Sequence, residues 1–356
     1  PMPSVLIIGA GPSGLTAAVE LARRGVMPTL VERRAEASNL SRAVGISASS
    51  LDILEPTGVA RAIRDEAVMF SAVGLHAGSR RIARLPLNFD DRSRIYGLAQ
   101  DRTEALLCRA FERLGGNIRY RTEFGALEQE TDGVSVTLNG QREWFDYVIG
   151  TDGVRSSVRQ VLGIGFPGYV LPDTWSIADL SAANWPRPDE FKGFLMPGGK
   201  VAFVLPIEAD RFRIVANASD ALAALPVPID VTGLHREASF RISVRQAERY
   251  SQGRVFLAGD AAHSHSPVGG RGMNLGIADA ADLAARLFAG NTEGYHAARH
   301  AEGAEVIAFS ERARRIVDGA GSLRRLAVAS GAAGLGVLPP LARFAMRRFV
   351  SGAPGA

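Results

Sequence analysis

The residues with the clearest chemical signature lie near the N-terminus, where glycines occur at the spacing G-x-G-x-x-G: Gly9, Gly11 and Gly14. They follow an apolar run, residues 5–8, that predicts a buried parallel strand, and they lead into a predicted helix over residues 12–24. A glycine lets a pyrophosphate approach the backbone, and the N–H groups at a helix start attract phosphate. The pattern, with Pro12 and Ser13 at the helix start, predicts a dinucleotide-binding loop.

An acidic residue after this loop supports the same interpretation. Glu32 ends a second predicted strand, 29–32, and lies 23 positions after Gly9. A carboxylate near this spacing accepts hydrogen bonds from ribose hydroxyls, and the neighbouring Arg33 is predicted to belong to the same site. The alternative is a glycine-rich turn without a ligand, which leaves the acid and the glycines unexplained.

A second motif lies in the middle of the chain, where another predicted strand, 144–150, leads into Asp152 and Gly153. The residues that follow predict a helix start that carries Arg155 and Arg159. An arginine at this point either binds a nucleotide phosphate or is an ordinary charge on a helix surface, and both interpretations of Arg159 stay open.

The third motif is the longest and covers residues 259–274, reading Gly-Asp-Ala-Ala-His-Ser-His-Ser-Pro-Val-Gly-Gly-Arg-Gly-Met-Asn. Asp260 ends a predicted buried strand, and a helix over residues 273–288 follows the motif. His263 and His265 stand at i, i+2 without a carboxylate at ligand spacing, which is poor geometry for a metal, so no metal site is predicted. The ring of His263 is expected to bond to backbone, and His265 is a candidate for lining an active site.

The composition is that of a soluble globular protein. The chain has 356 residues, 46% of them hydrophobic, and a formal net charge of only +4, without a basic run interleaved with aromatics. Nucleic-acid binding is therefore not expected, and the absence of a long apolar run predicts no membrane span. The single cysteine, Cys108, excludes an internal disulfide and is expected to be a buried, inert thiol. A cytoplasmic location fits these features.

Strand and helix patterns alternate along most of the chain, which is typical of an α/β protein. Residues 163–243 differ, because they are rich in proline and in short predicted strands, and they indicate a mostly antiparallel sheet inserted between two halves of the nucleotide domain. His76, Tyr96 and Arg213 fall in segments that could form this sheet, and each is expected to be an ordinary packing or surface residue and not a catalytic one. The tail over residues 301–350 predicts arginine-studded helices that pack on the body, with a membrane-surface helix as the alternative.

Together the three motifs resemble the class A FAD-dependent aromatic hydroxylases, the para-hydroxybenzoate hydroxylase-like monooxygenases. The third motif is similar to the version in the phenol and polyketide hydroxylase branch, from which it departs at Arg271, where glutamine is common. The resemblance covers nearly the whole chain. It implies a Rossmann-like (GR2-type) FAD-binding domain with an inserted substrate domain and C-terminal helices. The expected divisions are 1–70, 98–162 and 250–300 for the FAD-binding domain, 71–97 and 163–249 for the substrate domain, and 301–356 for the helices.

The resemblance also assigns FAD contacts by position, to residues of the three motifs and of two segments between them: Gly9, Gly11, Pro12, Ser13, Gly14, Glu32, Arg33, Arg42, Gln100, Arg102, Asp152, Asp260, Gly272, Met273 and Asn274. Arg42 would lie near the pyrophosphate and flavin, and Gln100 and Arg102 near the ribityl chain. Asp152 would serve both FAD and the reductant NAD(P)H, for which the chain shows no second glycine fingerprint of this kind.

The implied reaction is a monooxygenation in which NAD(P)H and molecular oxygen hydroxylate an aromatic or polyketide-like small molecule through a flavin C4a-hydroperoxide. The helix start at residues 272–274 would stabilise the negative charge of the reduced flavin. Pro267 would hold the loop in front of the ring, and Gly269 and Gly270 would leave room for oxygen. His265 completes the candidate catalytic set.

Two other functions stay open. A reductase or dehydrogenase on the same fold, similar to geranylgeranyl reductase, would show no substrate-stimulated oxygen consumption. A non-catalytic flavin-fold protein, similar to the Rab GDP-dissociation inhibitors, would take up no FAD. Halogenation is not predicted, because the W-x-W-x-I-P signature of flavin halogenases is absent. Many phenol and polyketide hydroxylases carry a thioredoxin-like C-terminal domain, which a chain of 356 residues is not expected to include, and a monomer or a homodimer is possible.

Overall fold

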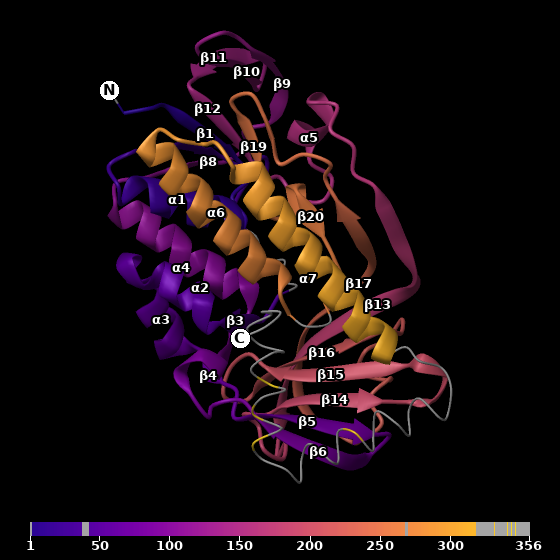
Figure 1. Ribbon diagram of the computed structural model, residues 1–356. Helices are drawn as coiled ribbons and strands as arrows, with labels where there is room; N and C mark the ends of the chain where they lie inside the picture. Colours follow the sequence, from indigo (N-terminus) through magenta and orange to yellow (C-terminus); the bar gives the residue numbers. More distant parts are fainter. Residues whose placement is uncertain are drawn as a thin grey trace.

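The computed structural model describes residues 2–37, 43–267 and 270–317, together with the single residues 331, 340, 343 and 346 (Figure 1). Three of the sequence predictions therefore lie outside the described residues, namely those for Arg42, for Gly269 and for most of the tail beyond residue 317.

A six-stranded sheet forms the centre of the molecule, in the order β18-β19-β12-β1-β2-β8. Its strands are β18 (Ser251–Gln252), β19 (Val255–Leu257), β12 (Tyr147–Gly150), β1 (Val5–Ile8), β2 (Thr29–Val31) and β8 (Ile118–Arg119). All neighbours are parallel except β18 and β19. Every residue of β1 and β19 is buried, because a parallel strand covered on both faces needs apolar side chains on both.

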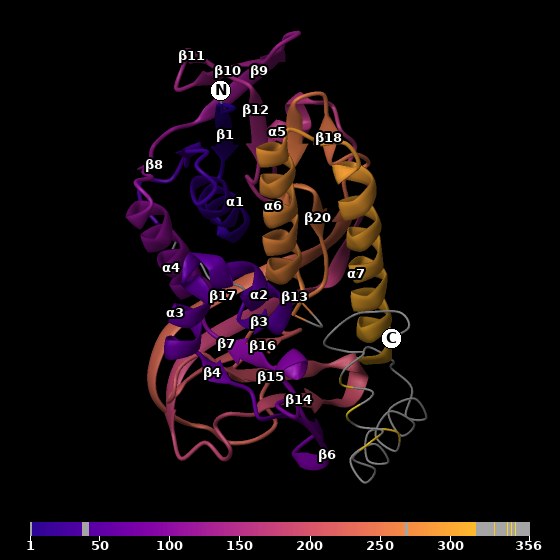
Figure 2. The ribbon, with the colours of Figure 1, turned by 60° about the vertical axis from the view of Figure 1, so that its left-hand side comes forward.

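Helices cover this sheet, and two of them start directly after a predicted motif. The helices are α1 (Pro12–Ala22), α2 (Ala48–Leu54), α3 (Val59–Glu66), α4 (Gln100–Arg113), α5 (Ser157–Val161), α6 (Gly272–Ala289) and α7 (Tyr295–Val317). Helix α1 contacts both α4 and α6, and α7 lies beside α6 in both views (Figures 1 and 2). The helix predicted over residues 12–24 is thus confirmed, although it ends two residues earlier, before a turn at Gly25 with φ of 88°.

The second large element is an eight-stranded sheet in the order β20-β17-β13-β16-β15-β14-β5-β6. Its strands are β20 (His263–Ser264), β17 (Asp230–Gln246), β13 (Gly168–Ala183), β16 (Arg211–Ala216), β15 (Val201–Pro206), β14 (Phe191–Leu195), β5 (Ala72–Ala77) and β6 (Arg80–Pro86). All its pairs are antiparallel except β14 with β5. The expectation of short strands is wrong for β13 and β17, which run 16 and 17 residues and pair along most of their length.

Two three-stranded sheets complete the fold. One consists of β3 (Gly45–Ser47), β7 (Ile95–Gly97) and β4 (Val68–Met69), and the other of β11 (Gln141–Phe145), β10 (Val134–Leu138) and β9 (Phe124–Gln129). The single strand predicted over residues 144–150 is in fact the end of β11 and all of β12, separated at Asp146. The α/β fold class is confirmed, whereas the domain boundaries stay a prediction. In the described parts of the chain, no helix combines the length and apolarity needed to cross a bilayer.

Candidate flavin-binding site

The three motifs and the acid at residue 32 meet at one edge of the six-stranded sheet. They follow β1, β12, β19 and β2, which are neighbours in the sheet. The last residues of these strands pair in register, since Ile8 lies beside Val31 on one side and Gly150 on the other, and Gly150 lies beside Leu257. Parallel strands of this kind end at the same edge, which is where open α/β sheets bind their ligands.

Of the three glycines in the first loop, Gly9 and Gly14 are tightly packed and Gly11 faces open space. A Cβ on Gly9, whose φ is 104°, would lie 2.5 Å from the Thr151 carbonyl oxygen, and a Cβ on Gly14 would lie 1.9 Å from the Gly9 carbonyl oxygen. A Cβ on Gly11 meets no described atom within 4 Å. Gly11 is also the N-cap of α1, and no described side chain caps that helix. Open space therefore faces N–H groups at the start of α1.

Glu32 is almost fully buried and receives hydrogen bonds from the protein itself. Its Oε2 accepts from the Ala10 N–H at 3.0 Å, and its Oε1 accepts from the Arg34 N–H at 3.0 Å. The Arg34 guanidinium also pairs with it at 3.1 Å. Burial raises the pKa of Glu32, but the hydrogen bonds from Arg34 and Ala10 outweigh it and lower the pKa overall. The carboxylate is ionised, and it tethers the glycine loop to the end of β2.

Asp152, in the second motif, has one oxygen in use and one without a partner. Its Oδ2 accepts from the N–H groups of Ser157 at 2.7 Å and Val158 at 3.2 Å, at the start of α5. Its Oδ1 is buried and has no hydrogen-bond partner among the described residues. A buried oxygen of this kind is costly unless a donor reaches it, so Asp152 is suited to a hydroxyl or amide of a bound ligand.

Arg159 is not the helix-surface charge that one of its two interpretations predicted, whereas a contact with a nucleotide phosphate stays a prediction. The side chain is buried and donates to the carbonyl oxygens of Ala261 at 2.7 Å and Val154 at 2.8 Å, while its guanidinium lies 3.7 Å from the centre of the Phe166 ring. It therefore joins the second motif to the third instead of standing on a helix surface.

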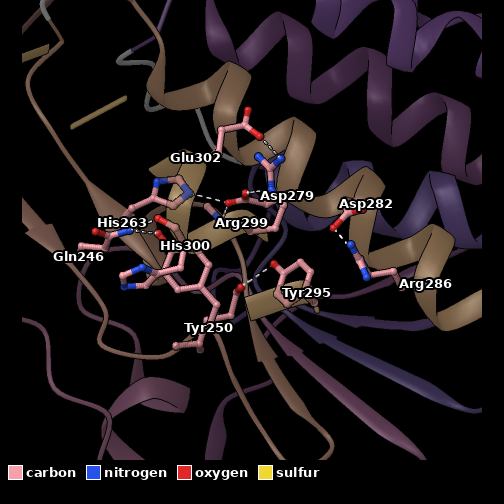
Figure 3. A network of polar contacts seen from close by, with 12 residues as sticks. Gln246, Tyr250, His263, Asp279, Asp282, Arg286, Tyr295, Arg299, His300 and Glu302 are labelled. Carbon is pink, nitrogen blue, oxygen red and sulfur yellow. Dashed lines mark hydrogen bonds and ion pairs between the residues drawn. The ribbon is translucent and has the colours of Figure 1, made fainter. Parts of the chain in front are cut away.

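A fully buried carboxylate, Asp279 of α6, holds the third motif in place (Figure 3). Its Oδ2 accepts from the Gly259 N–H at 3.1 Å and lies 2.5 Å from His263 Nε2, and its Oδ1 accepts from Arg299 of α7 at 2.7 Å. Burial raises the pKa of Asp279, but its contacts with His263 and Arg299 outweigh burial and lower it. The expectation that the His263 ring bonds to backbone is wrong, because its Nε2 pairs with this carboxylate.

The third motif ends at the start of α6, where Asn274 uses its whole side chain to anchor the helix. Its Oδ1 accepts from Ser50 Oγ at 2.7 Å and from the Ser47 N–H at 3.0 Å, and its Nδ2 donates to the carbonyl oxygens of Gly45 and Gly270, each at 3.0 Å. Arg271 is the N-cap of α6, and within the described ranges no side chain caps this helix either. Its backbone N–H groups remain for a ligand.

His265 lies against this helix start as a neutral imidazole. A Cβ on Gly272 would lie 3.6 Å from its Nε2, and its Nδ1 is 3.0 Å from the Ser266 carbonyl oxygen. Burial, together with the charges of His263 and Arg271, lowers the pKa of His265 to about 4. Because Nδ1 must carry the proton to donate to a carbonyl, Nε2 is an acceptor. It is buried, with no partner in the part of the chain that the structure describes.

Comparison with known proteins identifies the family. Residues 2–218 and 206–310 match a family model described as "FAD binding domain". The chain belongs to this FAD-binding family. The flavoprotein is 33% identical to a rifampicin monooxygenase of Streptomyces venezuelae over 331 residues, which are 85% of the chain and 69% of the relative. It is 35% identical to the 12-dehydrotetracycline 5-monooxygenase/anhydrotetracycline 6-monooxygenase of Streptomyces rimosus, over 80% of the chain and 62% of the relative.

Solved structures agree with these relatives. The anhydrotetracycline hydroxylase of Streptomyces rimosus superimposes with a TM-score of 0.80 at 30% identity, covering 99% of this chain and 76% of the other. The p-nitrophenol 4-monooxygenase of Pseudomonas putida DLL-E4 gives a TM-score of 0.88 at 22% identity, over 98% and 97% of the two chains, which shows a shared fold. The relationship to the class A flavoprotein hydroxylases is thereby confirmed.

The residues of this flavoprotein fit FAD. The space in front of Gly11, the two helix starts without a side-chain cap and the unpartnered Asp152 Oδ1 are features that a dinucleotide would satisfy. Asp260 is exposed in the turn after β19, at the same edge of the sheet. Met273 is buried in the first turn of α6, whereas Pro267 and Gly270 are exposed. Arg33 is exposed beyond Glu32.

The two predicted residues of α4 have different surroundings. Gln100 is anchored to the loop at Ala43, whose N–H donates to Gln100 Oε1 at 3.1 Å. Its Nε2 donates to Glu104 at 2.8 Å, a carboxyl that the sequence reasoning missed. Burial raises the pKa of Glu104 to about 7. Arg102 instead forms a partly exposed ion pair with Glu66 at 2.9 Å, and its predicted contact with the ribityl chain stays untested.

A buried ion pair in the eight-stranded sheet was also missed. Arg213 of β16 is fully buried, and its guanidinium makes two hydrogen bonds of 2.6 Å to Asp179 of β13. Its Nη1 reaches the Ala43 carbonyl oxygen at 3.4 Å. Arg213 therefore links the second sheet to the loop that Gln100 anchors, a role that alternation along the strand could not reveal.

Across the described residues, no group of three or more histidine, cysteine or carboxylate side chains is arranged to hold a metal ion. Cys108 is half-buried rather than fully buried, and burial raises its pKa to about 11, which keeps the thiol protonated and unreactive at neutral pH.

Proposed function

We propose that this chain is an FAD-dependent monooxygenase that uses NAD(P)H and molecular oxygen to hydroxylate an aromatic or polyketide-like small molecule. The observation that carries the proposal is the in-register ending of four neighbouring strands, which places the glycine loop, Glu32, Asp152 and the Gly259–Asp260 turn at one edge of one sheet. No other edge in the described parts of the chain gathers these groups.

The class of substrate rests on the relatives. Three of the relatives at 30% identity or more are named for rifampicin, for 12-dehydrotetracycline and anhydrotetracycline, and for pentachlorophenol. A ring activated by a phenolic oxygen suits transfer of an electrophilic oxygen. We therefore propose a phenolic or polyketide-like substrate, bound between the start of α6 and the eight-stranded sheet that contains β13 and β16.

When bound, FAD supplies the redox chemistry, accepting reducing equivalents from NAD(P)H and passing an oxygen atom from O2 to the substrate. The chain itself binds and orients. The start of α1 would hold the pyrophosphate, Glu32 and Asp152 would accept hydroxyl hydrogen bonds, and the start of α6 would stabilise negative charge on the ring. His265 Nε2, an acceptor on a base too weak to ionise a phenol, orients a hydroxyl instead of removing its proton.

The test is substrate-dependent oxygen uptake by the purified yellow protein. Phenols, naphthols and anthraquinone-type polyketides are screened for compounds that accelerate NADH or NADPH oxidation, and the products are weighed by mass spectrometry. We expect oxygen consumption in step with the oxidation and a product heavier by one oxygen atom. NAD(P)H oxidation with a reduced product and no oxygen uptake would instead identify a reductase. A colourless protein that takes up no FAD would overturn the proposal entirely.

A further inference from the structure

Arg271 occupies a position where its charge adds to that of a helix start. It is the N-cap residue of α6, with φ of −98° and ψ of −15°, and its carbonyl oxygen accepts from the Leu275 N–H at 2.9 Å. The helix runs 18 residues, so its dipole places about half a positive charge at this end. Arg271 adds a full positive charge to the same end.

The side chain of Arg271 is held close to the helix start. Its guanidinium lies 4.2 Å from the centre of the Phe309 ring, which comes from α7. Arg271 is only partly exposed, and burial lowers its pKa, but a guanidinium keeps its charge at neutral pH. Its charge also reaches His265, because it is one of the causes that lower the pKa of that histidine. The field of Arg271 therefore acts on groups at the start of α6.

Among the described residues, the charged groups that act on His265 at this end are engaged with other partners or are neutral. Glu311 of α7 is the carboxylate that acts on His265, and it is engaged by Arg314 at 2.8 Å and by the Tyr169 hydroxyl at 2.6 Å. His265 itself is neutral, and His263 is paired with Asp279 further along the motif. Removing the charge of Arg271 would therefore change the electrostatic field at the start of α6.

We propose that Arg271 is an electrostatic tuning residue that stabilises the anionic reduced form of FAD over the neutral oxidised form. This inference rests on the proposed function only in requiring that FAD binds with its ring at the start of α6. Two-electron reduction leaves a negative charge on the edge of the ring that faces the helix, while the oxidised ring is neutral. A fixed positive charge nearby favours the reduced form and raises the midpoint potential.

The experiment measures the potential of bound FAD in matched variants. R271Q removes the charge, R271M removes the charge but keeps an apolar contact for Phe309, and R271K keeps the charge. R286Q is the control, because Arg286 lies on the same helix about 22 Å away, from a rise of about 1.5 Å per residue. Each FAD-loaded variant is equilibrated with a reference dye while it is reduced, and its melting temperature is recorded to check folding.

We expect R271Q and R271M to bind reduced FAD about tenfold less tightly relative to oxidised FAD, by the Coulomb energy of a nearby charge. For a two-electron couple this is a potential lower by about 30 mV. The pH at which the reduced flavin takes up a proton, followed by absorbance, rises by about one unit for the same reason. R271K and R286Q stay close to the parent protein in both measurements.

Three results would overturn the role of Arg271: an unchanged potential in both neutral variants, an equal shift in R271K, or an equal shift in R286Q. The second would mean that stacking on Phe309 matters instead of charge, and the third that net charge matters instead of position. Should one neutral variant fail to fold, the other decides. FAD uptake without any hydroxylation would refute the proposed function and leave this test intact, whereas a chain that takes up no FAD would overturn both.

Discussion

Replacing Gly11 by aspartate should leave the stability of the fold unchanged or slightly raised while it weakens FAD binding. Gly11 has φ of −79° and ψ of −175°, which is the extended conformation that aspartate and asparagine adopt at an N-cap. A side chain here meets no described atom within 4 Å of its Cβ. The helix start gains a capping oxygen, worth a few tenths of a kcal/mol relative to glycine, and a favourable dipole contact of about 0.3–1 kcal/mol.

The same substitution should strongly weaken the binding of FAD. The carboxylate of Gly11→Asp stands where the pyrophosphate approaches, and two like charges about 4 Å apart repel by about 4 kcal/mol at an effective dielectric constant of about 20. At about 1.4 kcal/mol per factor of ten, this weakens FAD binding about a thousandfold. Gly11→Asn is the matched control, because it has the same shape and the same capping oxygen without the charge, and it should lose distinctly less affinity.

The assay titrates apoprotein with FAD and follows quenching of flavin fluorescence, with urea unfolding of each apoprotein measured in parallel. We expect Gly11→Asp to be as stable as the parent or slightly more so, yet unable to retain FAD at micromolar concentrations. An aspartate variant that binds FAD within threefold of the parent would refute the placement of the pyrophosphate at the start of α1. Equal losses for aspartate and asparagine would show that shape matters and charge does not.

Three further predictions follow from burial and charge. Gly14→Ala should lower the free energy of unfolding by more than about 3 kcal/mol, since its Cβ would lie 1.9 Å from a backbone oxygen; a urea midpoint near that of the parent would contradict this. Asp179→Asn should lower the free energy of unfolding by about 3–5 kcal/mol, because it leaves Arg213 buried without its partner. R119Q, which breaks the partly exposed pair of Arg119 and Glu143, should lower it by less than about 1 kcal/mol. Both variants are measured by urea unfolding. His265 has its pKa lowered to about 4 from 6.5, so the unfolded chain binds the extra proton between these values, and stability should fall by about 3 kcal/mol from pH 6.5 to pH 4. His265→Asn should remove that part of the pH dependence, and an unaltered slope would argue against a buried neutral ring.

Local patterns in the amino-acid sequence predicted the loops that form the site. The strand before Gly9, the helix after it and the acid at Glu32 are local signals, each set by burial or backbone freedom within a few residues. The same holds for Asp152 and for Asp260, both of which follow a buried strand. These signals sufficed to predict an α/β fold and a dinucleotide site, because they depend on neighbours in the chain. The assignment to FAD came from the resemblance to the aromatic hydroxylases.

Contacts between residues on different strands could not be predicted from local sequence patterns. The length of β13 and β17 could not be predicted, because register shifts after Val170, Asp179 and Ser181 interrupt the alternation of apolar and polar residues that marks a strand. Arg213 and Asp179, on neighbouring strands, are 34 positions apart, and neither residue type predicts burial unless its partner is known. Glu104 was missed because part of its surroundings, Glu32 and Arg34, comes from a segment much earlier in the chain.

The different roles of His263 and His265 follow from contacts that exist only in the folded chain. In the sequence, His263 and His265 are two residues apart and chemically equal. Folding brings Asp279 against the first, 16 positions later in the chain, and the start of α6 with Arg271 against the second. His263 therefore pairs with a buried carboxylate, whereas His265 is a neutral acceptor. The difference arises because the properties of an imidazole depend on burial and on neighbours that only the folded chain supplies.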